Sequence, residues 1–285
     1  MPALLAIVAS ALWGTGDYVG GLLSRRISSL AVVFLGMCTA LVAVGALAVV
    51  VRPPLGLNLL DGAAAGVAGA VGLVCFYRAM ATGPMSVVAP LSATGTAIPV
   101  LWDLANGASA NAVQGAGMLL AFAGVILAGG PEWRRSPDTA RSTLLFTLVA
   151  AIGFGLYFIF VAAGSQTSVL STLLGQRAAG VLFLAVPALR GWRSGASALS
   201  GLRERMPRKY LALLMVGGLF DVSANGIYGV STSLPGADLA VVTVLASLYP
   251  VMTTLLARGL LKERLRSVQN LGVIAALAGV LLLNA

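Results

Sequence analysis

The feature that most constrains this chain is a series of ten apolar stretches, each long enough to cross a lipid bilayer. A bilayer core about 30 Å thick needs about 20 apolar residues per helix. None of the stretches shows the alternation of barrel strands, and lipid offers no partner to a free backbone group. The sequence therefore predicts an all-α integral membrane protein with ten transmembrane helices. The stretches cover residues 3–23, 30–51, 61–81, 84–102, 111–130, 142–163, 168–189, 210–229, 236–257 and 268–284.

Composition separates the chain from soluble proteins and from metal-dependent ones. Of its 285 residues, 59% are hydrophobic and 9% are charged, whereas soluble domains carry about 25% charged residues. The sequence has no histidine, which is the commonest metal ligand. It also has no ATP-binding loop and no metalloprotease signature. We therefore expect no metal and no cofactor, and we expect any transport to be ion-coupled or facilitated.

The net charge of +9 is explained by where the basic residues lie. Apart from Arg52 and Arg177, they fall in or beside the loops after spans 1, 3, 5, 7 and 9. A ten-span topology places all of these loops on one side. The positive-inside rule then puts that side in the cytoplasm and both termini outside. Because the charge serves orientation and contact with anionic lipid, we expect a multi-pass protein of the inner (plasma) membrane and no nucleic-acid partner.

The chain also repeats itself. At a constant offset, Tyr77 aligns with Tyr228 and Pro99 aligns with Pro250. Each half holds five spans, and an odd number gives the halves opposite orientations. Inverted repeats of this kind build many transporters, with substrate near the midplane between the halves. We therefore predict a five-plus-five inverted repeat around a central cavity. Its first repeat, charged linker and second repeat are residues 1–133, 134–141 and 142–285.

Several short motifs carry a resemblance to a known family. They are Ala11-Leu12-Trp13-Gly14 in span 1, Gln176-Arg177-Ala178-Ala179 in span 7, and Glu263 followed by Gln269, Gly272 and Gly279-Val280. Together they resemble the drug/metabolite transporter superfamily, EamA type, across nearly the whole chain. The resemblance implies ten helices around a central cavity and a small-molecule substrate such as an amino acid, nucleoside, vitamin or drug. Two departures make the halves unequal, because Asn106-Gly107-Ala108 replaces the Glu and Gly36-Met37-Cys38 replaces the Arg in the first half.

Ionisable groups inside a membrane are expensive, so each one is a candidate for function. Asp17 lies four residues after Trp13, on the same helical face, where it could bind a cationic substrate or a proton, or pair with Arg25 as a helix-end residue. Arg177 could hold an anionic group of a substrate. Alternatively, it makes a fixed structural pair with Asp221 or with Asp17.

Polar and aromatic residues extend this candidate set. Asp221, Asn225 and Tyr228 follow helical spacing and form one polar stripe, which faces either a cavity or another helix. Aromatic residues at mid-span could line a cavity for an amphipathic substrate, or could pack or sit in the interfacial belt. The predicted substrate-binding residues are Trp13, Asp17, Tyr77, Phe154, Tyr157, Arg177, Asp221, Asn225 and Tyr228.

Proton coupling would need a membrane-buried acid, and Asp17 and Asp221 are the central candidates. The acid that pairs with Arg177 should stay ionised, whereas the other should exchange protons. We expect Asp17 to be the coupling residue. The prolines that interrupt spans 4 and 9, Pro90, Pro99 and Pro250, suit hinged or gating helices, with static kinks as the alternative.

These observations favour a secondary transporter that moves a small metabolite or drug across the inner membrane by alternating access, with export as the expected direction. The substrate would be amino-acid-like, nucleoside-like or an amphipathic cation. The alternative is a translocator of lipids or lipid-linked substrates, which a wide groove open to lipid would favour. The expected partners are the substrate, the bilayer and protons, and the protein is expected to act as a monomer or homodimer.

An enzyme is the remaining possibility that the motifs raise. Gly14-Thr15-Gly16-Asp17 spells the G-x-G-D of intramembrane aspartyl proteases, and Pro187-Ala188-Leu189 spells their P-A-L. That chemistry needs two aspartates at one site, and in that family the second aspartate lies on an earlier helix. No predicted span precedes the one that holds Asp17. We therefore expect no enzymatic activity.

Overall fold

The computed structural model describes residues 1–105, 112–133, 137–190, 199, 207–234, 245–246 and 248–283. Within these residues the chain forms helices and no strand. The helices are α1 (Pro2–Ser24), α2 (Ser29–Val51), α3 (Asn58–Thr82), α4 (Met85–Ala93), the 3-10 turn η1 (Thr94–Thr96), α5 (Ala97–Ala105), α6 (Ala112–Trp133), α7 (Pro137–Ser165), α8 (Val169–Leu189), α10 (Arg208–Ser233), α12 (Tyr249–Leu260) and α13 (Ser267–Leu283).

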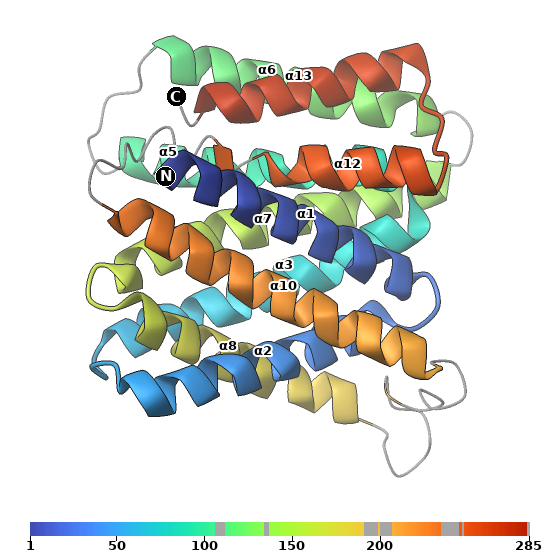
Figure 1. Ribbon diagram of the computed structural model, residues 1–285. Coiled ribbons are helices and arrows are strands. Elements are labelled where there is room, and N and C mark those ends of the chain that lie inside the picture. The colour runs from blue at the N-terminus through green and yellow to red at the C-terminus, as the bar shows by residue number, and fades with distance from the viewer. Residues whose placement is uncertain are drawn as a thin grey trace.

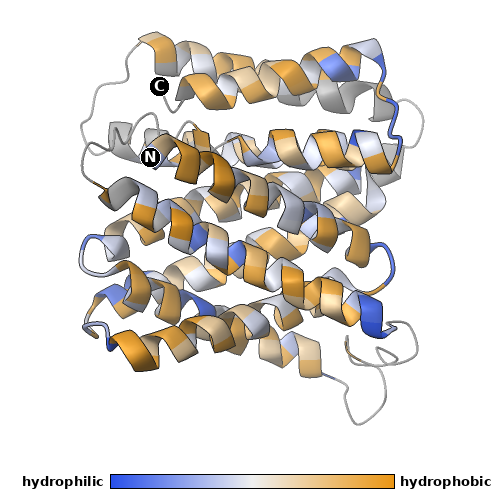
Figure 2. Cartoon of the chain, in the orientation of Figure 1, coloured by the Kyte–Doolittle hydropathy of each residue, from blue (hydrophilic) through white to orange (hydrophobic). Residues whose placement is uncertain are grey.

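The surface of the bundle is that of a protein surrounded by lipid. In the part of the chain that the structure describes, six helices are long and apolar enough to cross a membrane: α1, α2, α3, α7, α8 and α10. Large apolar side chains stay exposed on the outer helix faces, among them Val42 (73% exposed), Leu119 (75%) and Val186 (74%). Figure 2 shows hydrophobic residues along the helices and hydrophilic ones mainly at their two ends. A soluble protein rarely exposes so much apolar surface, so this is a multi-pass membrane protein.

Helix α2 and helix α8 begin in the same way. The side chain of Ser28 accepts a hydrogen bond from the backbone amide of Ala31, three residues on (3.2 Å). The side chain of Ser168 does the same for the amide of Ser171 (3.4 Å). Serine at this position satisfies an amide that has no partner within the helix. Each cap follows a loop of a few residues, so α2 turns back beside α1 and α8 turns back beside α7.

The predicted fourth span is broken, but not at its prolines. Pro90 lies inside α4, and the helix changes to the tighter η1 four residues later. The hydroxyls of Ser92 and Thr94 donate to the carbonyls of Ala89 and Leu91 (2.9 and 2.7 Å), which supports the backbone just before and at the break.

The other two prolines with a predicted hinge role lie near the starts of helices. Pro99 is the third residue of α5. Pro250 is the second residue of α12, where proline removes no intrahelical hydrogen bond. The chain therefore changes from α-helix to 3-10 helix between Pro90 and Pro99, and at neither proline.

The helices pack in a stack, with α6 and α13 at one side and α2 and α8 at the other (Figure 1). Between them, α3 packs on α7 and α8, while α10 packs on α1 and α2. Small residues allow this close approach. A Cβ added at Gly62 or Gly66 of α3 would meet the backbone of α8, and one at Gly218 of α10 would come within 2.6 Å of the Gly36 carbonyl oxygen.

The described basic residues after α1, at the start of α10 and between α12 and α13 lie at one end of the bundle. Arg25, just after α1, pairs with Glu263 between α12 and α13 (3.1 Å). Arg26 lies over the ring of Tyr210 near the start of α10, 4.7 Å from its centroid. Helix α1 begins and α13 ends at the opposite end (Figure 1). Helix α7 begins at Pro137, so part of the segment predicted as a charged linker is helical.

We expect both termini to lie outside the cytoplasm, because the basic loops share the other end. A C-terminal fusion to a reporter that is active only outside the cytoplasm should be active, and a reporter active only in the cytoplasm should be silent. The opposite pair of results would overturn the orientation. The helix packing described above would be unaffected.

Candidate functional site

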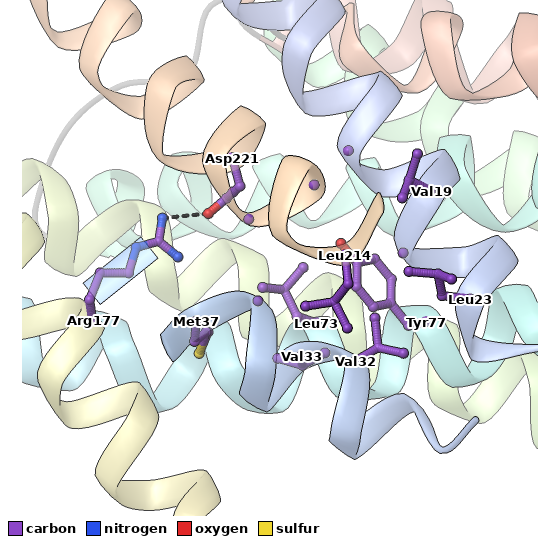
Figure 3. A pocket seen from close by; sticks show the side chains of 15 residues that line it. Val19, Leu23, Val32, Val33, Met37, Leu73, Tyr77, Arg177, Leu214 and Asp221 are labelled. Atoms are coloured by element: carbon purple, nitrogen blue, oxygen red, sulfur yellow. Dashed lines mark ion pairs between the residues drawn. The ribbon is translucent and has the colours of Figure 1, made fainter. Parts of the chain in front are cut away.

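An ion pair lies at the middle of the bundle. Arg177 of α8 places its guanidinium nitrogen 2.6 Å from a carboxylate oxygen of Asp221 of α10 (Figure 3). The Arg177 side chain is 2% exposed, whereas that of Asp221 is 33% exposed. A membrane-buried charge needs such a partner. The structure therefore realises the pair with Asp221 that the sequence offered as one of two alternatives.

The polar stripe of α10 connects this pair to α7. The Asn225 side-chain amide donates to the backbone carbonyl of Asp221, one turn earlier (2.7 Å). The hydroxyl of Tyr157 of α7 donates to the Asn225 amide oxygen (2.8 Å). Asn225 is only 8% exposed, so the stripe faces other helices and not lipid. Three helices thus meet in one hydrogen-bonded group.

This polar group is not saturated. The Nε atom of Arg177 and the amide oxygen of Gln176 are buried without a hydrogen-bond partner among the described residues. A buried donor or acceptor without a partner is costly. The site therefore retains hydrogen-bonding capacity that a water or a ligand could use.

Asp17 lies on α1 in the same region and has a different environment. It is partly exposed and forms a side-chain hydrogen bond with Tyr77 of α3. The Tyr77 ring rests directly over Gly20, where any Cβ would collide with it. Glycine at this position therefore brings Tyr77 to the acid. Among the described residues, Asp17 has no basic partner.

Aromatic side chains of α10 and α12 pack around Trp13 of α1. The ring of Trp13 lies 5.8 Å from that of Tyr228 of α10 and 6.3 Å from that of Tyr249 of α12, between centroids. Helix α12 lies close to α1 here, and the Thr253 hydroxyl donates a hydrogen bond to the Gly14 carbonyl (3.0 Å). Tyr249 was absent from the predicted binding set, since nothing in the sequence brings α12 beside α1.

Phe154 occupies a different place from the other predicted residues. Its ring makes an edge contact with Phe76 of α3, at 5.4 Å between centroids. It also covers Gly72. These contacts belong to the packing of α7 on α3. The structure therefore brings Phe154 into the helix interface, one layer from the polar group.

A small, partly open cavity of about 40 Å³ extends from the ion pair toward the basic end. Of the predicted residues, it touches Tyr77, Arg177 and Asp221. Its other walls are apolar or glycine residues of α1, α2, α3 and α10 (Figure 3). They are Gly16, Val19, Gly20, Leu23, Val32, Val33, Gly36, Met37, Leu73, Leu214, Gly217 and Gly218.

Comparison with known proteins identifies the family. The sequence profile of the EamA-like transporter family matches residues 1–130 and 141–285, which is most of the chain. The chain belongs to the EamA-like transporter family. It is therefore a membrane transporter of small substrates, and its family is one of transporters and not of enzymes.

Solved structures support the fold of this EamA-like transporter. One of them, a crystal structure, aligns with 99% of this chain and with 96% of the length of its own chain. The TM-score is 0.57 and the sequence identity is 17%. At that identity the likeness speaks for the fold alone. No curated protein matches the sequence.

Removing either member of the ion pair should destabilise this transporter unequally. Asp221→Asn leaves the enclosed Arg177 without a counter-charge and should cost roughly 3 kcal/mol. Arg177→Met should cost less, because the remaining carboxylate is partly exposed. The double variant should lose less than the sum of the two. Thermal unfolding in detergent would measure this, with Arg78→Gln, an exposed arginine, as the control. Additive losses would show that the two side chains do not interact.

Proposed function

We propose that this EamA-like transporter is a secondary transporter that exports a small metabolite or drug across the inner membrane by alternating access. Its ten spans would form a five-plus-five inverted repeat around a central cavity. The observation that carries the proposal is the group of charged and aromatic side chains at mid-bundle. Lipid cannot solvate charged groups, so charged side chains at this depth usually line the path of a polar substrate or ion. Arg177, Asp221 and Tyr77 border a cavity.

Helix packing supports the inverted repeat. If α1, α2 and α3 exchange places with α7, α8 and α10, the most extensive contacts among them are preserved. The contact of α3 with α7 becomes that of α10 with α1, and the contact of α3 with α8 becomes that of α10 with α2. The pairs α2 with α8 and α6 with α13 map onto themselves. Rocking of such halves about a shared site is the usual basis of alternating access.

The break between α4 and α5 supports movement of helices within the bundle. Its 3-10 turn packs against α7, where Gly95 touches the backbone of Ala151. A mid-helix 3-10 segment often marks a hinge. We place the hinge at Thr94–Thr96, between Pro90 and Pro99.

Proton coupling is assigned to Asp17 within this proposal. Arg177 holds Asp221 at 2.6 Å, so that acid serves to neutralise a buried cation. Asp17 has a hydroxyl partner in Tyr77 but no basic partner among the described residues. It is therefore the acid whose charge can change without leaving a buried arginine unpaired.

Transport by reconstituted proteoliposomes tests both parts. With pooled amino acids, nucleosides and cationic drugs, the unmodified protein should accumulate at least one compound when a pH gradient is imposed. Asp17→Asn should abolish that accumulation, because it removes the proton carrier, and should keep exchange at equal pH when the substrate is supplied well above its binding constant. Asp61→Asn, the same change in the first turn of α3, is the matched control.

Two outcomes would contradict these assignments. Accumulation by Asp17→Asn against a gradient would sink the coupling role of this residue. Failure of the unmodified protein to move any pooled compound, while a lipid-linked probe crosses the membrane, would favour a lipid translocator instead.

A further inference from the structure

The charges at mid-bundle do not balance. Among the described residues, the ionisable acids and bases of this region are Asp17, Arg177 and Asp221. Arg177 and Asp221 cancel at 2.6 Å. With Asp17 ionised, the region carries one negative charge in excess. An ion in a medium of low dielectric constant attracts a counter-ion far more strongly than it would in water.

Aromatic rings frame the acid that is in excess. Trp13 lies one turn before Asp17 on α1, and Tyr77 of α3 bonds to the carboxylate. The ring of Tyr249 of α12 lies 6.3 Å from that of Trp13, between centroids. The Tyr228 ring completes the group at 5.8 Å from Trp13. Each of these five side chains keeps some exposure, although their helices pack inside the bundle.

We propose that the transported substrate is an organic cation whose positive group lies against the Asp17 carboxylate and the rings around it. This rests on the transport proposed above and specifies its substrate class. Aromatic faces attract cations within about 6 Å, and clusters of rings recognise alkylammonium groups.

The same geometry disfavours an anionic substrate. An anion would meet two carboxylates, Asp17 and Asp221. The guanidinium that could neutralise it is enclosed, at 2% exposure, and is already paired. Releasing Arg177 to an anion would strand Asp221.

Three probes that share a phenyl ring and differ in charge test the proposal: benzyltrimethylammonium, phenylacetate and benzyl alcohol. The protein would be placed in lipid nanodiscs with Trp102, Trp133 and Trp192 each changed to Phe, so that Trp13 alone reports binding. The cation should quench Trp13 saturably, and the other two should not at equal concentration. Asp17→Asn should weaken cation binding by about tenfold, and Asp61→Asn should not.

Saturable binding of phenylacetate or benzyl alcohol as tight as that of the cation would overturn the substrate class. Undiminished cation binding by Asp17→Asn would do the same. Neither outcome touches the transport proposal, whose assay with mixed compounds assumes no substrate charge.

A second inference comes from Glu263, a residue that the site does not use. One carboxylate oxygen accepts hydrogen bonds from Arg25 and from the Met85 amide (3.1 and 3.2 Å). The other accepts from the amide and hydroxyl of Ser86 (3.0 and 2.6 Å). Glu263 therefore caps the first turn of α4 from a loop 177 residues away. An acid at a helix N-terminus is favoured by the amides and by the helix dipole.

These contacts hold two walls of the cavity together at the basic end. Arg25 also donates to the carbonyl of Met80, near the end of α3 (3.3 Å). Leu23, two residues before Arg25, and Tyr77, three residues before Met80, both line the cavity. Separating α1 from the turn between α3 and α4 would therefore widen the cavity toward this end.

We infer that Glu263 is a latch that keeps the basic end of the transporter closed. The aligned loop of the first half, residues 106–111, reads Asn-Gly-Ala-Ser-Ala-Asn and contains no acid. The first half therefore has no carboxylate at the position that corresponds to Glu263. The inference depends on the contacts at the closed end and not on any substrate.

Accessibility of a single cysteine would test the latch. Gly36→Cys suits this purpose, because Gly36 lines the cavity and a Cβ there meets nothing within 4 Å. Cys38 and Cys75 would be changed to Ala, and a membrane-impermeant maleimide would be applied to vesicles with the basic loops facing outward. Glu263→Gln should raise the labelling rate by about tenfold, because charge-assisted hydrogen bonds are lost.

Ser86→Ala removes one hydrogen bond to Glu263 and should raise the labelling rate less. This variant replaces Glu263→Gln in the test if Glu263→Gln folds poorly. Arg78→Gln, an exposed arginine at the same end, should leave the rate unchanged. Equal labelling rates in folded Glu263→Gln, Ser86→Ala and unmodified protein would overturn the latch.

Discussion

The need to pair one buried arginine organises the centre of this transporter. Arg177 is buried at the middle of a membrane helix, where an unpaired guanidinium would strongly destabilise the folded protein. Its partner, Asp221, fixes α8 against α10 at 2.6 Å. Asn225 and Tyr157 then attach α7 to the same point. The arginine is enclosed and the acid is partly exposed, so the pair presents its carboxylate side to the cavity.

The cavity itself follows from an inequality between the two halves of the sequence. Where the second half has Arg177, the first half has Gly36. The arginine fills its site completely, whereas the glycine has open space before it. Helix α10 approaches the Gly36 backbone because Gly218 has no side chain, since a Cβ there would lie 2.6 Å from the Gly36 carbonyl oxygen. The absence of a side chain at Gly36, the position aligned with Arg177, therefore leaves room for the cavity.

Much of this was accessible from the sequence, because hydropathy and helical spacing are local properties. They predicted the long helices, the stripe of Asp221, Asn225 and Tyr228, and an acid partner for Arg177. Contacts between distant segments were not accessible. Tyr249 joins Trp13 only because Gly14 lets α12 cross α1, and Glu263 meets α4 across 177 residues. The break in the fourth span was also misplaced, because Pro90 is accommodated within α4 and the chain changes helix type at Thr94.

Pseudo-symmetric packing does not make the two ends of the molecule equal in energy. Exchanging the helices preserves their most extensive backbone contacts, but the polar side chains do not follow this exchange. Glu263 gathers four hydrogen bonds at the basic end, and its aligned loop has no acid to do the same. In the proposed alternating-access cycle, an inverted repeat would permit two related conformations, and side chains without a counterpart in the other half would decide which one is favoured at rest. On this proposal, Glu263 at the ends of the helices sets the balance between inward and outward states, and Asp17 at their centre sets the charge of the substrate.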